Sequence, residues 1–478
     1  MNKNIIKYDD VINKFSPSKY KIWQSNDEQQ DLNRIIIVLD DDPTGSQTVH
    51  SIPVYTSWND ETIHTILNGN DKLVYILTNS RGLTASDTEK LHRQFARDLS
   101  KISESLKKEY ILISRSDSTL RGHYPLETEV LKNEIEANSA IRFDGEIIIP
   151  FFLEGGRFTV DDTHYVKNGE DLIPAGMTEF AQDKTFGYSA SDLKEWVEEK
   201  TKGEFKSEAV ISITLDEIRN LKTESIYEKI MSLKDFNKMA VNAMNYEDLE
   251  VFTHCLKKAL NSGKNYLFRT AASFVKVIGN IPSQPLLSKE KMCGKEENRP
   301  GLIVIGSHVK KTTQQFQELK KVENVEFIEF DVSKVKEDTS MEQEILRVKE
   351  KVNDSLKKGM DACVYTSREY HQADVKNSKS EANLLFSVKV SEGLVGIVKG
   401  LEIQPGYIIA KGGITSSDIG VKALNVKKAQ VMGQILPGVP VWKLNNESMF
   451  PNLPYIIFPG NVGQEDSLRK TVELLKAI

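Results

Sequence analysis

Arginines and aspartates gather in short polar loops that follow apolar runs in the first half of the chain. They are Asp41, Asp42, Arg81, Arg115, Asp117, Arg121 and Arg157. A guanidinium group binds a carboxylate or a phosphate through two parallel hydrogen bonds, and an aspartate accepts a hydrogen bond or a proton from a hydroxyl. These loops therefore predict a site for a ligand that is both anionic and hydroxylated, such as a sugar acid. The alternative is that the charges form structural salt bridges between the loops.

Three glycine-containing turns mark the second half of the chain, each between an apolar run and an expected helix. They are Gly306-Ser307, Gly412-Gly413 and Gly460-Asn461-Val462-Gly463. Glycine lets the backbone approach phosphate oxygens, and a helix N-terminus supplies N–H donors and a positive dipole. One such turn often serves turn geometry alone, but three in one region predict a nucleotide site. The chain has neither the G-x-x-x-x-G-K-[ST] motif nor a G-x-G-x-x-G after an expected strand, so neither a P-loop nor a nicotinamide site is predicted.

Metal-binding and disulfide patterns are missing from the sequence. The cysteines are odd in number and lack metal-ligand spacing, which favours a reducing compartment; they are Cys255, Cys293 and Cys363. Because no partner is visible for any histidine near the loops and turns, we interpret three of them as structural: His123, His164 and His308. No metal site built by the protein alone is predicted.

The apolar runs before these loops predict strands of a parallel sheet. They are continuous and rich in β-branched residues, as expected of strands that are buried on both faces between helices. Ligands of such α/β sheets bind beyond the carboxyl ends of the strands, so the loops should share one rim in each half of the chain. Apolar residues at spacings of three and four also predict a helix over 91–106, with Ser86 and Glu89 as its capping box.

Residues 281–300 separate two such α/β regions. This segment loses apolar periodicity and holds three prolines and many charges, so we predict that it is a linker. The expected organisation is an N-terminal domain over residues 1–280 and a C-terminal domain over residues 301–478. Both should be α/β domains with mainly parallel sheets, and the active site is expected in the cleft between them.

The composition excludes several classes of partner. The 478-residue chain has a formal net charge of -6, so it lacks the basic footprint of a nucleic-acid-binding protein. No run of about 20 apolar residues is present, so no membrane span is expected, and the first residues lack the apolar core of a signal peptide. We therefore expect a cytoplasmic protein. The sequence leaves open whether it forms a homo-oligomer.

The polar loops carry the motifs of a known family. The segments Asp41-Asp42-Pro43-Thr44-Gly45, Ser116–Gly122, Gly156-Arg157-Phe158-Thr159 and Thr178–Asp183 resemble, in order, motifs of the four-carbon acid sugar kinases. The three glycine turns are similar to the nucleotide-binding turns of that family. The resemblance implies an N-terminal sugar-acid domain and a C-terminal ATP domain. It also implies transfer of the γ-phosphate of ATP, with Mg²⁺, to the terminal hydroxyl of a threonate, an erythronate or a 3-oxo-tetronate.

The matching positions suggest roles for individual residues. Asp42 or Asp41 is expected to orient or deprotonate the attacking hydroxyl. The residues expected to bind the sugar acid are Thr44, Arg81, Asp117, Ser118, Thr119, Arg121 and Arg157. Those expected to bind the nucleotide are Ser307, Gly412, Gly413, Thr415, Gly460, Asn461 and Gly463. Ile414 stands where the family commonly has an acidic residue, so no Mg²⁺ ligand is predicted at that position.

Two other functions fit parts of these patterns. A non-catalytic sensor could bind a sugar acid and a nucleotide, but such a protein needs no proton acceptor like the Asp41-Asp42 pair. A dehydrogenase could use a doubly wound α/β fold, but the dinucleotide fingerprint is missing. Turnover of ATP would distinguish a kinase from the sensor, and a nicotinamide absorbance scan would identify the dehydrogenase.

Overall fold

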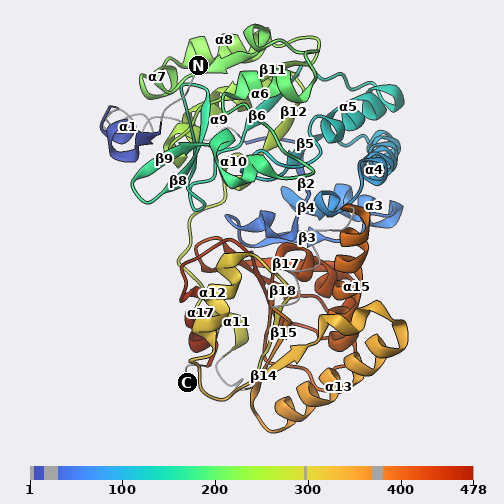
Figure 1. The fold of residues 1–478 in the computed structure, drawn as a ribbon. Helices are drawn as coiled ribbons and strands as arrows, with labels where there is room; N and C mark the ends of the chain where they lie inside the picture. Colours follow the sequence, from blue (N-terminus) through green and yellow to red (C-terminus); the bar gives the residue numbers. More distant parts are fainter. Residues whose placement is uncertain (1–4, 15–30, 295–298, 369–379, 477–478) are drawn as a thin grey trace. The chain divides into compact units, whose positions relative to one another are not determined.

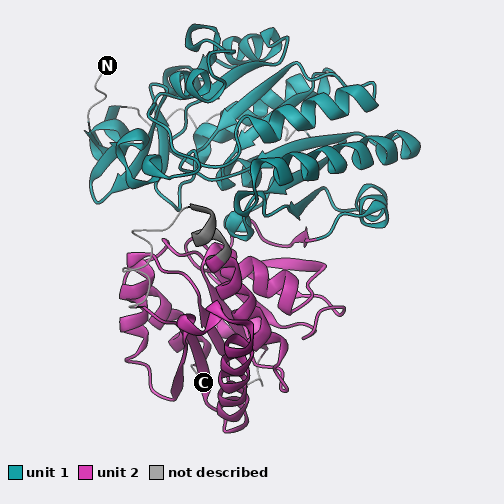
Figure 2. Ribbon diagram, turned by 45° about the vertical axis from the view of Figure 1, so that its right-hand side comes forward, with its two compact units in different colours: residues 1–48, 57–282 teal, residues 49–56, 283–478 magenta. Residues whose placement is uncertain are grey.

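The computed structural model describes residues 5–14, 31–294, 299–368 and 380–476. The chain forms two compact units (Figure 2). Unit 1 contains Met1–Thr48 and Ser57–Pro282, and unit 2 contains Val49–Thr56 and Ser283–Ile478. In the part of the chain that the structure describes, no helix combines the length and the apolar character needed to cross a bilayer.

Unit 1 is built on a parallel sheet with the strand order β10-β11-β6-β12-β5-β2-β4. In that order the strands are Ile211–Ile213, Asn237–Val241, Gly145–Ile149, Tyr266–Thr270, Tyr110–Arg115, Ile35–Asp40 and Leu73–Leu77. Nearly every residue of the central strands is buried, which explains their uninterrupted apolar character. A second, antiparallel sheet has the order β1-β9-β8-β7, formed by Ile6–Lys7, Asp171–Pro174, Thr163–Asn168 and Arg157–Val160.

The helices of unit 1 connect these strands. They are α1 (Tyr8–Lys14), α3 (Asp60–Asn68), α4 (Ala85–Leu106), α5 (Leu126–Asn138), α6 (Leu193–Lys200), α7 (Leu215–Arg219), α8 (Thr223–Ser232), α9 (Tyr246–Asn261) and α10 (Ala272–Ile278). The expected crossover helix is α4, with Phe95, Leu99 and Ile102 buried on its apolar face. The predicted capping box was wrong, because the N-cap is Thr84, whose hydroxyl accepts a hydrogen bond from the Asp87 N–H.

Unit 2 has the strand order β3-β17-β18-β19-β16-β13-β15-β14. In that order the strands are Ile52–Tyr55, Lys428–Leu436, Val439–Leu444, Pro454–Phe458, Ile408–Lys411, Leu302–Ile305, Asp361–Thr366 and Val325–Phe330. The last five are parallel, whereas β17 and β18 pair antiparallel with their neighbours. Both units are therefore α/β with mainly parallel strands, as predicted.

Helices cover both faces of the unit 2 sheet (Figure 1). They are α11 (Lys289–Cys293), α12 (Lys310–Leu319), α13 (Asp338–Lys357), α15 (Ser380–Lys399), α16 (Gly413–Asp418), the π-helical turn η7 (Ile419–Ala423) and α17 (Ser467–Lys476). Figure 1 shows α12 and α17 on one side of the strands, with α13 and α15 on the other. The chain also contains short 3₁₀ turns: η1 (Pro43–Ser46), η2 (Ser80–Gly82), η3 (Ala175–Met177), η4 (Glu179–Gln182), η5 (Ser207–Ala209) and η6 (Val332–Lys336).

The unit boundaries differ from the expected domains in two places. Residues 49–56 belong to unit 2 because β3 forms an antiparallel ladder with β17, a long-range pairing that has no local sequence signal. From Ser283 onward the expected linker also belongs to unit 2, as far as the structure describes it. Leu287 and Met292 are buried in its core, and the Leu287 N–H donates to the Gln434 carbonyl over 2.8 Å. A few apolar side chains among many charges are enough to hold this segment against the sheet.

Candidate functional site

Asp41 and Arg81 form a two-point ion pair at the carboxyl ends of β2 and β4. Arg81 Nε lies 3.1 Å from Asp41 Oδ2, and Nη2 lies 2.5 Å from Oδ1. The Ser116 hydroxyl donates to the same carboxylate. Burial alone would raise the pKa of Asp41, but the positive charges of Arg81, Arg115 and Arg269 outweigh it and lower that pKa. Asp41 is thus an ionised carboxylate whose two oxygens are both engaged, which suits positioning Arg81.

Asp42 is held differently from its neighbour. Its side chain caps η1 by accepting a hydrogen bond from the Thr44 N–H over 2.8 Å. Its second oxygen, Oδ2, lies 3.5 Å from Arg81 Nη1, and 16% of its side chain is exposed compared with 2% for Asp41. The backbone bond fixes the orientation of the carboxylate, and the partly exposed side chain can accept a hydrogen bond from a ligand hydroxyl. Of the two predicted catalytic aspartates, Asp42 is therefore better placed for contact with a ligand.

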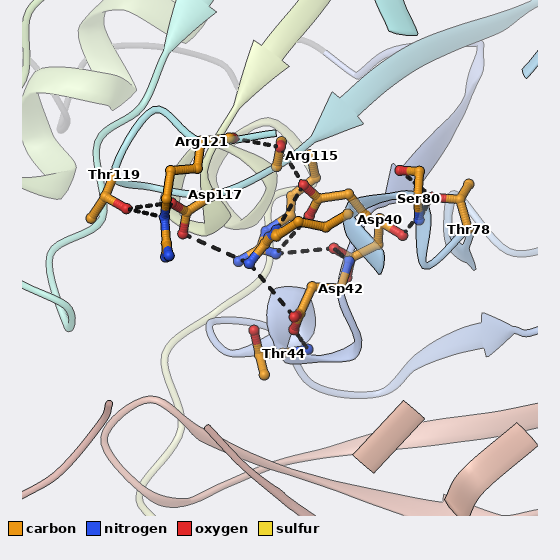
Figure 3. Close-up of polar contacts among 12 residues, drawn as sticks. Asp40, Asp42, Thr44, Thr78, Ser80, Arg115, Asp117, Thr119 and Arg121 are labelled. Carbon is orange, nitrogen blue, oxygen red and sulfur yellow. Dashed lines mark hydrogen bonds and ion pairs between the residues drawn. The ribbon is translucent and has the colours of Figure 1, made fainter. Parts of the chain in front are cut away.

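Asp40 is a buried acidic residue that the sequence reasoning missed. It is the last residue of β2, in register with Arg115 of β5, whose Nη1 lies 3.0 Å from Asp40 Oδ1 (Figure 3). Burial raises the pKa of Asp40 to about 7 despite the opposing effect of Arg115. A Cβ atom at Gly45 would lie 1.9 Å from Asp40 Oδ2, so the glycine of the Asp-Asp-x-Thr-Gly motif is required for this close packing. An acidic residue at the end of an otherwise apolar strand was the available signal.

The Ser116–Gly122 loop wraps around Asp117. Arg121 Nε donates to Asp117 Oδ2 over 2.8 Å, and the Thr119 hydroxyl donates to the same oxygen (Figure 3). Arg81 Nη1 lies 3.8 Å from Asp117 Oδ1, so Arg81 joins this loop to Asp41 and Asp42. Burial opposes the ionisation of Asp117, but Arg121 and Arg81 keep its pKa well below the usual range. The structure therefore brings the predicted residues of the first half together.

Ser118 and His164 tie the same loop to β8. His164 is fully buried, with Nε2 2.8 Å from the Ser118 carbonyl oxygen and Nδ1 3.0 Å from the Thr159 hydroxyl. Burial lowers the pKa of His164 to about 4, so the imidazole is neutral near pH 7. His123 lies against the loop too, with Nε2 3.1 Å from the Leu83 carbonyl oxygen. Both contacts agree with the structural roles that we predicted for these histidines.

Arg157 and Arg121 both approach the ring of Phe180. Their guanidinium carbons lie 5.6 and 5.1 Å from its centre, which is cation–π distance. Arg121 also lies 3.6 Å from a carboxylate oxygen of Asp183. In contrast, Arg157 Nε is buried and has no hydrogen-bond partner in the described part of the chain. Nε of Arg115 and of Arg269 is also buried without a partner, but Arg115 pairs with Asp40 and Arg269 donates to the Arg121 carbonyl. The Arg157 guanidinium makes no such contact among the described residues, and a buried N–H without a partner is costly, so Arg157 is the arginine of this site most suited to bind an anionic ligand.

The three glycine turns of unit 2 meet at one rim of its sheet. They follow the adjacent parallel strands β13, β16 and β19. The Ser307 N–H donates to the Lys411 carbonyl over 3.2 Å, and the Gly412 N–H donates to the Phe458 carbonyl over 2.9 Å. The Thr312 hydroxyl lies 2.9 Å from the Gly460 carbonyl oxygen and 3.1 Å from Ser307 Oγ. The predicted nucleotide-binding turns are therefore in contact with one another.

Close packing explains the glycines at this rim. Gly412 has a φ of 122°, and a Cβ atom there would lie 3.0 Å from the Ser307 Cβ. A Cβ at Gly460 would lie 2.8 Å from Ser307 Oγ. Thr415 is buried in the first turn of α16, whereas Gly413, Asn461 and Gly463 are partly or fully exposed. Because the glycines carry no side chain, a phosphate can approach the backbone of these turns.

Two cations at this rim were not predicted as site residues. Lys411 is the last residue of β16 and is fully buried, with Nζ 2.5 Å from the Pro459 carbonyl oxygen. Arg368 follows β15, and its Nη1 donates to the Ser307 carbonyl over 2.5 Å. A charged residue at the end of an apolar strand was the signal for both. Ile414 is 63% exposed, and within the described ranges no three His, Cys, Asp or Glu side chains are grouped as metal ligands.

Comparison with known proteins defines the class of protein. Residues 36–278, more than half of the chain, match the family model described as a sugar-binding N-terminal domain. Residues 302–468 match the model described as a nucleotide-binding C-terminal domain. The chain is thus a two-domain protein with a sugar-binding and a nucleotide-binding domain, and it belongs to the four-carbon acid sugar kinase family.

Solved structures share the fold at low sequence identity. One is a Salmonella typhimurium LT2 protein provisionally named a tRNA synthase, with 15% identity and a TM-score of 0.65; the match covers 91% of this chain and 98% of that one. Another is a Haemophilus influenzae protein of a family with unknown function, with 16% identity and a TM-score of 0.58, covering 92% and 100%. At sequence identities this low, the comparison shows only that the fold is shared. No curated protein matches the chain.

Proposed function

We propose that this protein is an ATP-dependent kinase that phosphorylates the terminal hydroxyl of a small sugar acid such as threonate, erythronate or 3-oxo-tetronate. Membership of the family supports the reaction class, because one chain combines a sugar-binding domain with a nucleotide-binding domain. The three cysteines, none of which is in a disulfide, are compatible with a reducing cytoplasm. The position of the active site between the domains and the formation of a homo-oligomer stay predictions.

One observation carries the sugar-acid assignment. The site of unit 1 combines a buried arginine N–H that lacks a partner, at Arg157, with a partly exposed carboxylate, at Asp42. An acid group on the ligand would satisfy Arg157, and a hydroxyl would donate to Asp42. The hydroxyls of Thr44, Ser118 and Thr119 add polar groups in the same loops, which fits a small polyhydroxylated acid.

The proposed chemistry assigns a separate role to each aspartate. Asp42 would orient the attacking hydroxyl and accept its proton, because the backbone bond to Thr44 holds its carboxylate in place. Asp41 would fix Arg81, whose charge lies beside Asp42 and Asp117. Phosphoryl transfer depends mainly on alignment and charge neutralisation, so a rigid set of charged groups is what the reaction needs.

The turns of unit 2 fit the phosphates of ATP by their chemistry. Backbone N–H groups at Gly413 and Asn461 are suited to phosphate oxygens, and the packed glycines Gly412 and Gly460 keep side chains out of the way. ATP would supply the phosphoryl group. Mg²⁺ would be held chiefly by the phosphates, as is common for this ion, since the described residues offer no cluster of three acidic or imidazole ligands.

An ADP-release assay with Mg²⁺ tests the proposal directly. We expect ADP only when a four-carbon sugar acid is present, and none with the corresponding neutral sugar alcohols. Release with neutral sugars but not with acids would overturn the substrate class. Tight binding of both ligands without turnover would favour the non-catalytic sensor instead.

A further inference from the structure

Two basic side chains at the rim of the unit 2 sheet, the buried Lys411 and the partly buried Arg368, have no acidic partner among the described residues. In unit 1, by contrast, Arg81 and Arg121 are each paired with aspartates. The recorded contacts of Lys411 and Arg368 are with backbone carbonyls and aromatic rings. Within the described residues neither cation forms an ion pair with a carboxylate. Charges taken out of water are normally paired, so Arg368 gives this rim a positive charge that no described carboxylate compensates.

The geometry of Arg368 leaves two donors unused. Its Nη1 bonds to the Ser307 carbonyl, and its guanidinium carbon lies 5.5 Å from the centre of the Phe316 ring. These two contacts fix the plane of the guanidinium group. Nε and Nη2 are buried and have no hydrogen-bond partner in the described part of the chain. Two fixed N–H groups of one guanidinium match two oxygens of a phosphate group.

Lys411 supports the neighbouring turn and adds positive charge to it once the amine is protonated. Its ammonium group lies 2.5 Å from the Pro459 carbonyl oxygen and 3.3 Å from that of Gly460. Burial, with a smaller effect from the positive charges of Lys311 and Arg368, lowers the pKa of Lys411 to about 6. The strands that end in Lys411 and precede Arg368 both pair with β13. The two cations therefore flank the Gly306-Ser307 turn.

We infer that Arg368 binds the phosphate chain of a nucleoside di- or triphosphate through Nε and Nη2, and that Lys411 is a positioning residue for the Gly460 turn. This inference rests on the proposed function and names the cation of its nucleotide site. The inference also distinguishes contacts with the phosphates from contacts with the nucleoside. We place the contact at the β-phosphate, which ATP and ADP share and AMP lacks, so removal of Arg368 should weaken ATP and ADP but leave AMP nearly unaffected.

Calorimetry on the full chain with ATP, ADP and AMP tests the role of Arg368. We expect Arg368→Gln to weaken ATP and ADP by about 10- to 100-fold, the range for a lost charge-assisted hydrogen bond. Arg368→Lys should lose less, because it keeps the charge without the planar fork. The matched control is Arg347→Gln, since Arg347 also donates to a backbone carbonyl but is paired with Glu344. It should bind all three nucleotides normally.

The outcomes separate this inference from the proposed function. Wild-type protein that binds none of the nucleotides would overturn both. Normal ATP affinity in Arg368→Gln, or an equal loss for AMP, would overturn the role of Arg368 alone. If Arg368→Gln does not fold, Arg368→Lys decides: an ATP affinity equal to that of the wild type contradicts the bidentate contact.

Proton uptake provides an independent test for Lys411. An anion bound at this rim favours the charged form of the lysine, so ATP binding at pH 7 should take up close to one proton. Titrations in buffers with different ionisation enthalpies measure this number. Lys411→Met keeps the length of the side chain and should abolish the uptake. Uptake that persists in this variant would show that Lys411 does not respond to the nucleotide.

Discussion

Arg81 holds Asp41 through both carboxylate oxygens but reaches Asp42 through one oxygen only, at 3.5 Å. The two adjacent aspartates of one motif therefore have different environments. Asp41 is shielded and ionised, and Asp42 has an oxygen that a ligand can approach. This difference allows their roles to be tested separately.

Asp42→Asn should lower kcat far more than it changes KM for either substrate. Asparagine keeps the size of the side chain and its cap on Thr44, but it cannot accept the hydroxyl proton. Loss of a general base typically costs about 10²–10⁴-fold in rate. Steady-state kinetics measure kcat and KM, and a melting temperature checks that the fold is kept. Near-full turnover of Asp42→Asn would rule out its role as the base.

Asp41→Asn should instead destabilise the fold. Removing one charge of a buried ion pair leaves Arg81 uncompensated, which typically costs about 3–5 kcal/mol. Because Arg81 is 20% exposed, the loss should lie at or below the lower end of that range. Thermal unfolding of Asp41→Asn beside Asp42→Asn is the comparison. Equal melting temperatures of the two variants would contradict a positioning role for Asp41.

Arg157→Gln should raise KM for the sugar acid by about 10- to 100-fold, because a charge-assisted contact to the acid group is lost. The KM for ATP should stay within about twofold of the wild type by the same reasoning, since Arg157 belongs to the sugar-binding unit. Arg97→Gln is a suitable control, as that arginine is 51% exposed and is paired with the carboxylate of Glu134. An unchanged KM for the acid in Arg157→Gln would place the acid group elsewhere.

Gly412→Ala should weaken ATP binding and leave sugar-acid binding intact. The new Cβ would press on Ser307, and the φ of 122° is strained for any L-residue. Gly359→Ala is the matched control in the same unit, because Gly359 has a φ of 74° but no atom within 4 Å of a new Cβ. Calorimetry with each ligand measures the difference. If both variants lose ATP affinity equally, backbone strain rather than crowding at the turn is responsible.

The lowered pKa of the buried His164 predicts that the protein is less stable in acid. Its pKa is about 4 in the folded protein and about 6.5 when unfolded, so the unfolded chain binds more protons between these values. The free energy of unfolding should therefore fall as the pH drops from 6.5 to 4, by up to about 3 kcal/mol from this group. His164→Asn should flatten that dependence, whereas replacing the exposed His64 should not. An unfolding free energy that depends on pH as steeply in His164→Asn as in the wild type would contradict the assignment of this dependence to His164.

Local pattern in the sequence determined the α/β class and the residues of the site. Apolar β-branched runs report burial on both faces of a strand, and the polar residues directly after them must lie at strand ends. The loops around Asp41, Asp117 and Gly412 could therefore be identified before any contact was known. The same reasoning placed Asp40 and Lys411 in these loops but did not select them as site residues, because the burial and the contacts of their side chains are not visible in the sequence.

Only the tertiary structure decided which of these residues form ion pairs with one another and which keep an unpaired donor. The sequence presents Arg81, Arg121 and Arg157 as equivalent, but the first two are paired with aspartates and Arg157 keeps a buried donor without a partner. The pairing of β3 with β17 likewise assigns residues 49–56 to the second unit. Such relationships join residues far apart in the chain, and their energies depend on distance and burial, which no local pattern encodes.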